Sequence, residues 1–463
     1  MPEKLKPSFY NFLFDLDDGK HLAFNAVTGA FVRIHEEDYE KTKALFSSPE
    51  DFVVNDESDR KLLEDAKRAK FIIDSDTDEF DLLRFRHNMG KYSSERFYLT
   101  VMPTLECNFR CPYCYENPRK GKMSPEMQQA LVRWVEEKLP GCRGLGVGWF
   151  GGEPLLAFDV IRNLTADFIA LCKKRDIQYT GSMTTNGFFL IPKIADRLEE
   201  LSIKMLQVTL DGPPESHNAR RVLRNGRGSF QRIIDNLTLI CENYPDINII
   251  LRVNFDTQNY DSIPEIFGFI PDSLRLRSRI YFRQVYPPPQ WWDKSTPTKT
   301  SAVPRDVGSL SFIHLEKEAL DREFLVLLSN YSPSAGYCEA DYVNHFVVDP
   351  DCNLHKCTVA FDEEHRIGHI TPEGKAVMNM PLLAKWMLRE TMERDNCRVC
   401  RILPLCMGGC GFTTLCNKGR NVCSTVNSEN MAVENLKLLY RNKIIEESRK
   451  RQLNQPEPAE AAL

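Results

Sequence analysis

The middle of the chain shows apolar runs that alternate with amphipathic segments. Between the runs, segments such as 124–139, 159–175 and 229–243 carry apolar residues at helical spacing. Strands that alternate with helices indicate a parallel sheet, and six repeats are two fewer than an eight-stranded barrel contains. We therefore predict an α/β fold, a partial (βα)6 TIM-like barrel that stays open. The six predicted strands lie at 98–104, 145–150, 177–183, 204–210, 247–254 and 279–285.

The start of the chain has a different pattern, with short apolar runs and tight turns. The first runs are broken at Asp-Asp-Gly (17–19) and Val-Thr-Gly (27–29), which are typical of hairpins. Helical spacing follows near 36–46 and 58–70. We predict a small α+β, winged-helix-like module over residues 1–90. It would serve either to dock a leader peptide or as a structural lid.

The part of the chain after the last predicted strand is less regular. A Pro- and Trp-rich connector occupies 286–304, and a helix is expected near 314–330. A cysteine-rich stretch leads from there to an amphipathic helix over about 428–448. We predict a barrel domain over 95–310, a cysteine-rich domain over 311–448 and a disordered tail over 449–463.

Composition and charge narrow the class of protein. With 42% hydrophobic and 27% charged residues, the chain resembles neither disordered nor membrane proteins. The formal net charge of -5 argues against a general surface for nucleic acid or anionic membrane, which needs clustered Lys and Arg. The first residues lack the apolar core of a signal peptide. We expect a cytoplasmic protein with no nucleic-acid or membrane partner.

The distribution of the 15 cysteines points to metal rather than to disulfides. In a reducing compartment a disulfide framework is not expected, and twelve of the cysteines fall into two groups with short spacings. Cys142, Cys172 and Cys241 lie apart from these groups, and we expect them to be small buried hydrophobic residues.

The first group follows the first predicted strand directly. Cys107, Cys111 and Cys114 are separated by three and two residues. Three such thiolates can hold one face of a [4Fe-4S] cube, which leaves its fourth iron without a protein ligand. A four-coordinate zinc site is the alternative, but it needs a fourth ligand that the residues after Cys114 do not offer.

Polar motifs follow the next three strands. Gly-Gly-Glu-Pro (151–154) comes after the second strand, where paired glycines allow close approach of a ligand and Glu153 can accept hydrogen bonds from an amine. Thr-Thr-Asn-Gly (184–187) follows the third strand, and Thr-Leu-Asp-Gly (209–212) follows the fourth. The carboxyl ends of parallel strands form one edge, where barrel enzymes carry their chemistry.

With these motifs the chain resembles the radical S-adenosylmethionine (SAM) superfamily. Its hallmark is Cys-x3-Cys-x2-Cys after the first strand, with an aromatic residue before the last cysteine. The resemblance implies that the open iron binds the amino and carboxylate groups of SAM, whose reductive cleavage gives a 5'-deoxyadenosyl radical. Reduced flavodoxin or ferredoxin is the expected electron donor. The implied cofactor-binding residues are Tyr113, Gly151, Gly152, Glu153, Thr209 and Arg221, the last with Arg220 as an alternative.

Other polar residues are expected near the same cavity. Arg252 and Asn254 stand among apolar residues on the fifth predicted strand, and we expect both to face the cavity. The resemblance places Arg221 rather than these residues at a polar group of the cofactor, and its planar, permanently charged guanidinium suits a carboxylate.

The second group of cysteines has a specific spacing, Cys-x2-Cys-x5-Cys-x3-Cys from Cys397, followed by a later cysteine. It resembles the SPASM extension of peptide-modifying radical enzymes, which holds two auxiliary [4Fe-4S] clusters; a pair of zinc ribbons is the alternative. The resemblance implies one cluster on Cys338, Cys357 and Cys410 and a second on Cys397, Cys400, Cys406 and Cys423.

Two further cysteines depart from this pattern. Cys352 stands where the family often has glycine, and it is either the fourth ligand of the first auxiliary cluster, a free thiol or a redox-active residue. Cys416 fits no position of the pattern, and we expect it to be structural.

Three functions agree with these motifs. The leading hypothesis is a maturase that abstracts hydrogen from a ribosomally made peptide and forms a cross-link such as a thioether. The second is an anaerobic sulfatase-maturating enzyme, which makes formylglycine. That branch places an aspartate base after the equivalent of Cys357, where this chain has Thr358, although Asp362 could substitute. The third is a non-catalytic iron-sulfur electron carrier.

Overall fold

The computed structural model describes residues 4–116, 118–285, 305–328, 332–393, 395–416, 423 and 429–453. These residues divide into two compact units, and the chain passes between the units several times. The first unit contains Met1–Ser93, Leu328–Val343 and Lys385–Leu439; the second contains Ser94–Leu327, Asn344–Ala384 and Tyr440–Leu463. The domain boundaries drawn from the sequence stay predictions.

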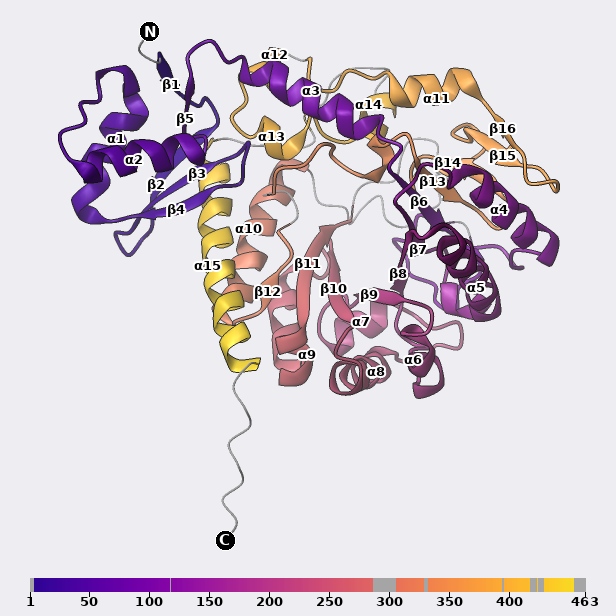
Figure 1. The fold of residues 1–463 in the computed structure, drawn as a ribbon. Helices are drawn as coiled ribbons and strands as arrows, with labels where there is room; N and C mark the ends of the chain where they lie inside the picture. Colours follow the sequence, from indigo (N-terminus) through magenta and orange to yellow (C-terminus); the bar gives the residue numbers. More distant parts are fainter. Residues whose placement is uncertain are drawn as a thin grey trace. The chain divides into compact units, whose positions relative to one another are not determined.

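The second unit is built on one large sheet. Its parallel strands β6 to β11 lie in sequence order, and each pairs with the next (Figure 1). All six predicted strands are present, which confirms the α/β class and the open, mainly parallel sheet. They are β6 (Arg96–Val101), β7 (Gly144–Trp149), β8 (Gln178–Thr185), β9 (Ile203–Thr209), β10 (Asn248–Phe255) and β11 (Ser278–Gln284).

The sheet continues at both ends with segments that the sequence did not mark as strands. The two-residue strand β12 (Leu325–Val326) pairs parallel to β11, and β13 (His345–Val348) pairs parallel to β6. Strands β14 (Asn353–His355), β15 (Gly368–Ile370) and β16 (Ala376–Met378) then add in antiparallel order.

One predicted helix has different bounds. The helix expected near 314–330 is α10 (Arg305–Asp321), and the apolar residues that follow belong to β12 instead. Glu323 has a left-handed backbone (φ 58), and the amide of Phe324 donates to the carbonyl of Ala319, so the chain turns out of the helix at this point. Burial against the sheet, not helical spacing, explains this apolar run.

Helices cover the outer face of the parallel strands (Figure 1). Trp134 of α4 is fully buried and contacts Phe97 of β6 and Phe346 of β13, with ring centroids 5.4 and 5.3 Å away. This aromatic group fixes β13 to the first barrel strand. The helices of this part are α4 (Pro125–Lys138), α5 (Phe158–Arg175), α6 (Pro192–Leu198), α7 (Pro214–Arg220), α8 (Phe230–Asn243) and α9 (Asp272–Arg277).

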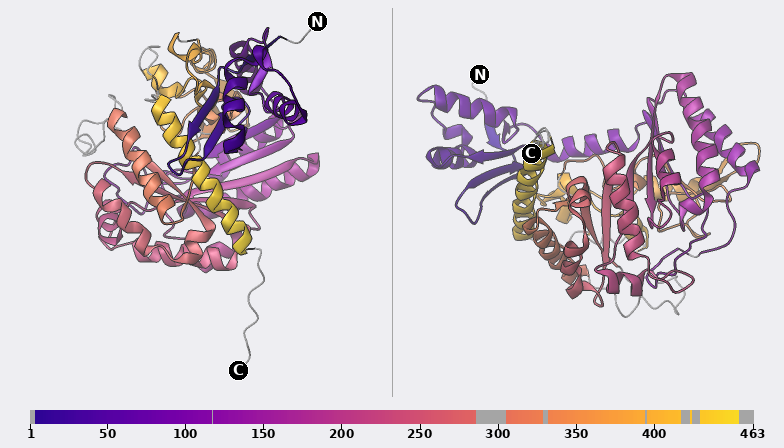
Figure 2. Two further views of the ribbon diagram at one scale, coloured as in Figure 1. Left: turned by 90° about the vertical axis from the view of Figure 1, so that its left-hand side faces the viewer. Right: turned by 90° about the horizontal axis from the view of Figure 1, so that it is seen from below.

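The start of the chain folds as strands followed by helices, as the sequence indicates (Figure 2). The antiparallel pairs join β2 to β3 and β3 to β4, and β1 pairs with β5. Buried Asn25 holds the second turn, because its side-chain oxygen accepts hydrogen bonds from the amides of Val27 and Thr28 at 3.0 Å. The elements are β1 (Leu5–Pro7), β2 (Asn11–Asp15), β3 (His21–Asn25), β4 (Phe31–Ile34), α1 (Glu36–Ser47), α2 (Glu57–Arg68), β5 (Ile72–Asp74) and α3 (Glu79–Lys91).

The last part of the chain is mostly helical. Its final helix extends to Leu453, five residues beyond the end expected from the sequence, while residues 454–463 and the connector 286–304 lie outside the described residues. No helix in the described ranges has the length and apolarity needed to cross a membrane. The helices are α11 (Met380–Met387), α12 (Asp395–Arg398), α13 (Leu403–Cys406), α14 (Gly411–Cys416) and α15 (Glu429–Leu453).

The turn after β8 gives a test of this packing. Gly187 has φ +80, and a Cβ there would lie 2.8 Å from Val208 and 3.1 Å from Ile233. We expect Gly187→Ala to destabilise the protein by about 2–5 kcal/mol, from backbone strain and overpacking together. Gly226→Ala is the matched control, because its φ is +75 and nothing lies within 4 Å of the added carbon. It should cost only about 1–2 kcal/mol in chemical denaturation, and equal losses would contradict the packing.

Candidate active site

The predicted motifs lie in the loops that follow β6, β7, β8 and β9. Because these strands are parallel neighbours, the loops meet at one edge of the sheet. The cysteine loop is also held by the segment that follows α7. The amide of Arg110 donates to the carbonyl of Val222 at 2.7 Å, and the amide of Arg224 donates to that of Asn108 at 2.9 Å. The loop therefore has a defined backbone, fixed by residues more than a hundred positions away.

The three thiols of this loop lie close enough for their charges to interact. Burial raises the pKa of Cys107 to about 12, and the charges of Glu153 and Cys111 add to the effect. Burial also raises the pKa of Cys114, as do the nearby charges of Cys111 and Cys107. Such thiols become thiolates only when a cation compensates them, which is what an iron-sulfur cluster supplies. The donor set therefore fits a cluster.

The described residues do not favour the zinc alternatives. Within the described ranges, no three Cys, His, Asp or Glu side chains are gathered tightly enough to hold one metal ion. Thiolates that bind separate irons of a cube need no such convergence on a single point. Two backbone amides stabilise negative charge on the sulfur atoms. The amide of Phe109 donates to Cys107 Sγ at 3.4 Å. The amide of Glu116 donates a hydrogen bond to Cys114, which lowers the pKa of that thiol.

Tyr113 is the centre of a part-buried hydrogen-bond network beside the cysteines. Its hydroxyl donates to Asp211 Oδ2 and accepts from Arg221 Nη1 at 2.9 Å and from Asn254 Nδ2 at 3.2 Å. Burial, followed by the charge of Asp211, raises the pKa of Tyr113 well above its usual value. Tyr113 therefore stays neutral and ties the loop after β6 to β9, α7 and β10.

Arg221 brings a permanent positive charge to this network. Burial opposes that charge, but Tyr113, Cys111 and Asp211 more than offset the burial and raise the pKa of Arg221. Its Nε is buried and has no hydrogen-bond partner among the described residues. One buried donor thus remains for a ligand, and an arginine with a spare donor suits a carboxylate. The predicted carboxylate-binding role of Arg221 fits this geometry.

The neighbouring Arg220 has a different environment. Its Nη1 lies 2.9 Å from Asp256 Oδ2, and both side chains are buried, at 7% and 2% exposed. The structure therefore separates two adjacent arginines that the sequence could not distinguish. Arg220 pairs with Asp256 and also lies over the ring of Tyr113, 5.1 Å from its centroid, whereas Arg221 donates a hydrogen bond to the Tyr113 hydroxyl.

Glu153 is completely buried and accepts three hydrogen bonds from the protein. Its Oε1 accepts from the amide of Leu155 at 3.1 Å and from Thr185 Oγ1 at 2.7 Å, and its Oε2 accepts from the amide of Asn186 at 2.8 Å. Burial nevertheless raises its pKa. These contacts join the loops after β7 and β8, so the side chain has a structural task, and its predicted contact with the amine of SAM stays a prediction.

The two glycines before Glu153 have a similar task. A Cβ on Gly151 would lie 2.4 Å from the carbonyl oxygen of Thr104, and one on Gly152 would lie 2.4 Å from that of Glu106. Glycine is therefore required here by the backbone of the cysteine loop. A close approach of SAM to the same glycines remains a prediction.

The remaining predicted residues lie on β9 and β10. Thr209 ends β9, is 7% exposed and stands beside Arg252 in the parallel register. Arg252 Nε donates to Asn254 Oδ1 at 2.9 Å, and Asn254 in turn joins the Tyr113 network. Residues two apart on a strand share a face, so Arg252 and Asn254 lie together on the side of the sheet that carries the network.

Sequence reasoning assigned no task to three residues of this site. Asp211 accepts a hydrogen bond from the hydroxyl of Tyr113. Burial raises the pKa of Tyr115, and the charges of Cys114 and Cys357 add to this effect, so Tyr115 lies near both thiols. Cys357 therefore lies near the first cysteine loop.

Glu116 is the third of these residues. It is 9% exposed, and its Oε2 has no partner among the described residues. Burial, and then the charge of Glu153, raises the pKa of Glu116 to about 8. The only sequence signal was its position, two residues after the third cysteine of the loop.

Comparison with known proteins bears on this arrangement. The family model of the radical SAM superfamily matches residues 101–270, which hold the cysteine loop and the strands that carry the network. The chain has a radical SAM domain. Such a domain uses SAM and a [4Fe-4S] cluster.

Relatives and solved structures extend the likeness beyond this domain. The cysteine-type anaerobic sulfatase-maturating enzyme of Clostridium novyi is 26% identical over 334 residues, which cover 66% of this chain and 84% of that protein. The structure of anSMEcpe with bound AdoMet and Cp18Cys peptide has a TM-score of 0.55 at 17% identity and covers 77% of this chain and 99% of its own. Streptococcus suis SuiB bound to precursor peptide SuiA gives 0.51 at 14% identity, with 91% and 99% covered.

The distal cysteines are divided between the two units. Cys352 and Cys357 belong to the second unit, together with the radical SAM domain. In the first unit, burial lowers the pKa of Arg389, while the charges of Cys338 and Cys410 act in the opposite direction. The guanidinium of Arg389 therefore lies near both of these thiols, and it also pairs with Asp341.

The second proposed set of cysteines also shows an interaction. The charge of Cys423 acts on Cys400 and raises its pKa, although burial is the larger cause. Two members of the set therefore lie near each other, as the proposed second cluster requires.

Cys352, one of the predicted cluster ligands, contacts the interior of the second unit. It is fully buried, and its Sγ lies 3.5 Å from the carbonyl oxygen of Met127 in α4. Its backbone is left-handed (φ 60), the conformation that favours glycine at this hairpin turn. The thiol packs against α4 here, and the three alternatives for Cys352, namely the fourth ligand of the first auxiliary cluster, a free thiol or a redox-active residue, stay predictions.

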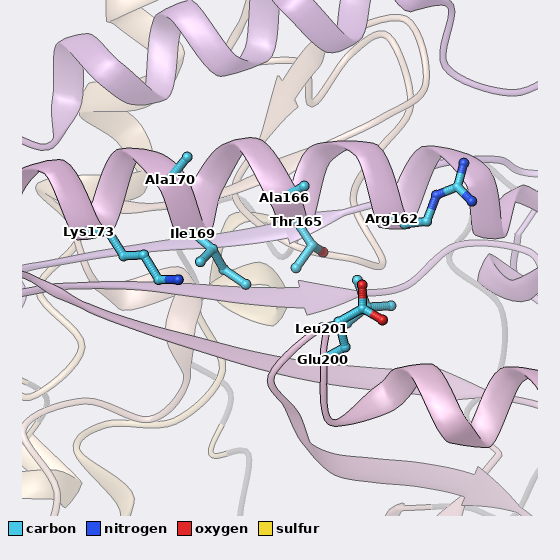
Figure 3. Close-up of a pocket in the computed structure, with 8 residues that line it drawn as sticks. All are labelled: Arg162, Thr165, Ala166, Ile169, Ala170, Lys173, Glu200 and Leu201. Atoms are coloured by element: carbon cyan, nitrogen blue, oxygen red, sulfur yellow. The ribbon is translucent and has the colours of Figure 1, made fainter.

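Three cysteines lie outside both groups. Cys142, Cys172 and Cys241 are buried, at 8%, 2% and 4% exposed, which confirms the expectation for them. A surface hollow of about 300 Å³ lies between α5 and the residues Glu200 and Leu201. Figure 3 shows the side chains that line it. None of the predicted site residues lines it, so the hollow is separate from the candidate active site.

The two adjacent arginines generate a prediction. Arg220→Ala should lower the free energy of unfolding by about 3–5 kcal/mol, because it leaves Asp256 charged and buried without a partner. Replacing both residues, Arg220→Ala with Asp256→Ala, should recover part of that loss. Chemical denaturation measures both, with Arg227→Ala at an exposed position as the control, expected within about 0.5 kcal/mol of the parent. A loss below about 1 kcal/mol for Arg220→Ala would contradict the assigned ion pair.

Proposed function

We propose that this radical SAM enzyme matures a peptide or protein by abstracting hydrogen from a ribosomally made peptide and installing a cross-link such as a thioether. The observation that carries the proposal is the loop of Cys107, Cys111 and Cys114, whose thiols interact and lie against Arg221. Three thiolates leave one iron of a cube open, and the neighbouring guanidinium offers a donor for the carboxylate of SAM.

The chain's own residues have separable tasks in this proposal. Cys107, Cys111 and Cys114 hold the cluster, and Tyr113 fixes the direction of Arg221 through its 2.9 Å hydrogen bond. Glu153 holds the loops in register. When bound, the cluster and SAM supply a carbon radical that removes a hydrogen atom from the substrate.

A peptide substrate is supported by two observations. The solved structures similar in fold include one with a Cp18Cys peptide and one with the precursor peptide SuiA. In addition, β4 is an edge strand of the three-stranded sheet in the first unit, and Val32 on it is 44% exposed. An edge strand can bind an extended leader peptide by adding it to the sheet. We propose that residues 1–90 dock the substrate in this way.

The distal cysteines are proposed to hold two auxiliary clusters. One would use Cys338, Cys357 and Cys410, and the charges of Cys338 and Cys410 act on the same guanidinium. These clusters would accept the electron that is released when the substrate radical is oxidised, while reduced flavodoxin or ferredoxin would supply the first electron. The second set comprises Cys397, Cys400, Cys406 and Cys423.

A sulfatase-maturating activity is the second candidate, because a cysteine-type anaerobic sulfatase-maturating enzyme is 26% identical to the chain. Against it, Thr358 follows Cys357 and cannot act as a base near neutral pH. Asp362, the possible substitute, accepts from the amide of His365 at 2.9 Å and lies 2.7 Å from its Nδ1. That carboxylate is therefore already engaged, and we rank this activity second.

The proposal predicts the loss of SAM cleavage when the cysteine loop is removed. Protein that is reconstituted with iron and sulfide and reduced with dithionite should release 5'-deoxyadenosine from SAM. Replacing Cys107, Cys111 and Cys114 together with Ala should lower this release to the level without enzyme, whereas Cys142→Ala, at a buried cysteine outside both groups, should retain it. Chromatography of the nucleoside products measures the effect. Release by the triple variant would refute the site, and no release by the parent would favour the electron carrier.

A second experiment separates the two enzymatic candidates. The reduced enzyme is incubated with SAM and either a Cys-rich peptide encoded beside its gene or a sulfatase-derived peptide that contains Cys or Ser. Mass spectrometry should show loss of two hydrogens and a new internal bond in the first peptide. Formation of an aldehyde in the second peptide, detected with a hydrazide, would favour the sulfatase-maturating activity instead.

A further inference from the structure

A buried arginine of the first unit lies beside two of the distal cysteines, and the proposed function leaves it without a task. The side chain of Arg389 is 6% exposed and pairs with that of Asp341, which is 5% exposed. A Cβ on Gly411 would lie 2.1 Å from Cζ of Arg389 and 2.4 Å from its Nε. The guanidinium therefore lies against the backbone of Gly411, the residue that directly follows Cys410.

The carboxylate of Asp341 connects the same guanidinium to Cys338. Its Oδ2 accepts hydrogen bonds from the amides of Tyr337 at 2.7 Å and of Cys338 at 3.3 Å. In return, the amide of Asp341 donates a hydrogen bond to the side chain of Cys338. Arg389 is thus fixed beside both cysteines, and the charges of Cys338 and Cys410 act on its guanidinium.

Lys91 is a second buried cation next to Arg389. It is 4% exposed, and its Nζ donates to the carbonyl oxygen of Arg389 at 3.5 Å and lies 5.5 Å from the ring centroid of Tyr92. Within the described ranges no carboxylate forms an ion pair with Lys91, and Glu390, whose charge acts on it, is exposed. Burial, and then the charge of Arg389, lowers the pKa of Lys91 to about 8, so its ammonium group stays mostly charged at pH 7.

Positive charge is therefore in excess among the buried side chains of this region. Arg389 and Lys91 are two cations, and Asp341 is their one buried carboxylate among the described residues. The buried Nε of Arg389 also has no hydrogen-bond partner in these ranges. Buried charge without a counter-charge is costly, so this region is suited to an anion. An iron-sulfur cluster held by thiolates meets that need, because its sulfur atoms carry negative charge and accept hydrogen bonds.

We propose that Arg389, together with Lys91, supplies the positive charge that stabilises the reduced form of the first auxiliary cluster. The inference rests on the proposed function, in which Cys338, Cys357 and Cys410 hold that cluster. Uptake of one electron makes a cluster more negative by one charge, and nearby cations and N–H donors favour the more negative form. The raised reduction potential suits the proposed task of accepting an electron when the substrate radical is oxidised.

The test is a redox titration of the reconstituted full-length protein at pH 7, followed by electron paramagnetic resonance of the reduced clusters. The signal of the first auxiliary cluster is the one that disappears when Cys338→Ala and Cys410→Ala are combined. At the midpoint potential of the parent, Arg389→Gln should lower the ratio of reduced to oxidised cluster about 10-fold, a shift of about 59 mV for one electron. Arg68→Gln, in the same unit with a 76% exposed side chain, is the matched control and should change the ratio less than about 2-fold.

Arg389→Lys separates the charge from the shape of the side chain. It keeps the positive charge and loses the planar fork, so its ratio should stay within about 3-fold of the parent. A fall as large as that of Arg389→Gln would show a role in packing alone and would overturn the inference. An unchanged or higher ratio in Arg389→Gln would overturn it as well.

Iron content is measured for each variant, because Arg389→Gln leaves Asp341 charged and buried. If that variant binds less iron than the parent, Lys91→Met decides the question, since it leaves no buried carboxylate without its partner. A fall of at least about 2-fold in the ratio then supports the inference, and no fall overturns it. If the double variant of Cys338 and Cys410 keeps the iron and every signal of the parent, the proposed cluster itself is wrong, and the inference fails with it.

Discussion

The hydroxyl of Tyr113 is the contact on which the arrangement of the site depends. It joins the cysteine loop to Asp211 after β9, to Arg221 after α7 and to Asn254 on β10. The loop is also anchored by packing, because Phe109 is 2% exposed and its ring centroid lies 6.2 Å from that of Phe188. The part-buried hydroxyl adds three hydrogen bonds to this packing, and without it Asp211 Oδ2, Arg221 Nη1 and Asn254 Nδ2 would each lose a partner.

The same network explains how two arginines in sequence are given different tasks. Arg220 pairs with Asp256 at 2.9 Å, and its Nε and Nη2 are buried without a partner among the described residues. Arg221 is instead surrounded by Tyr113, Asp211 and Cys111, which keep it charged and leave one N–H without a partner among the described residues. In the loop after β7, the carboxylate of Glu153 differs from Arg221, because it accepts three hydrogen bonds from the protein itself.

Much of the second unit could be predicted from the sequence because its strands are apolar-rich runs separated by segments of helical spacing, and within β6, β8 and β11 the buried residues alternate with less buried ones. The short strands β12 and β13 could not, because two- and four-residue segments carry no periodic signal. The pairing of β13 with β6 joins residues about 245 positions apart, as the hydrogen bond between Thr100 and His345 shows. Spacing located the cysteines but not the direction of each thiol, so the sequence could not show that Cys352 packs against Met127.

The charges of the site also indicate how cofactor binding and folding are linked. Burial raises the pKa of Cys107, Cys111 and Cys114, so that the three thiols are held in a form that does not bind metal well. Buried Glu116 adds a further acceptor that no cation among the described residues compensates. Groups of this kind destabilise the protein until a positively charged partner binds, and a partner that binds only the folded state returns its binding free energy as stability. The cysteine loop should therefore be held in place from two sides, by Tyr113 through hydrogen bonds and by the cluster through its charge.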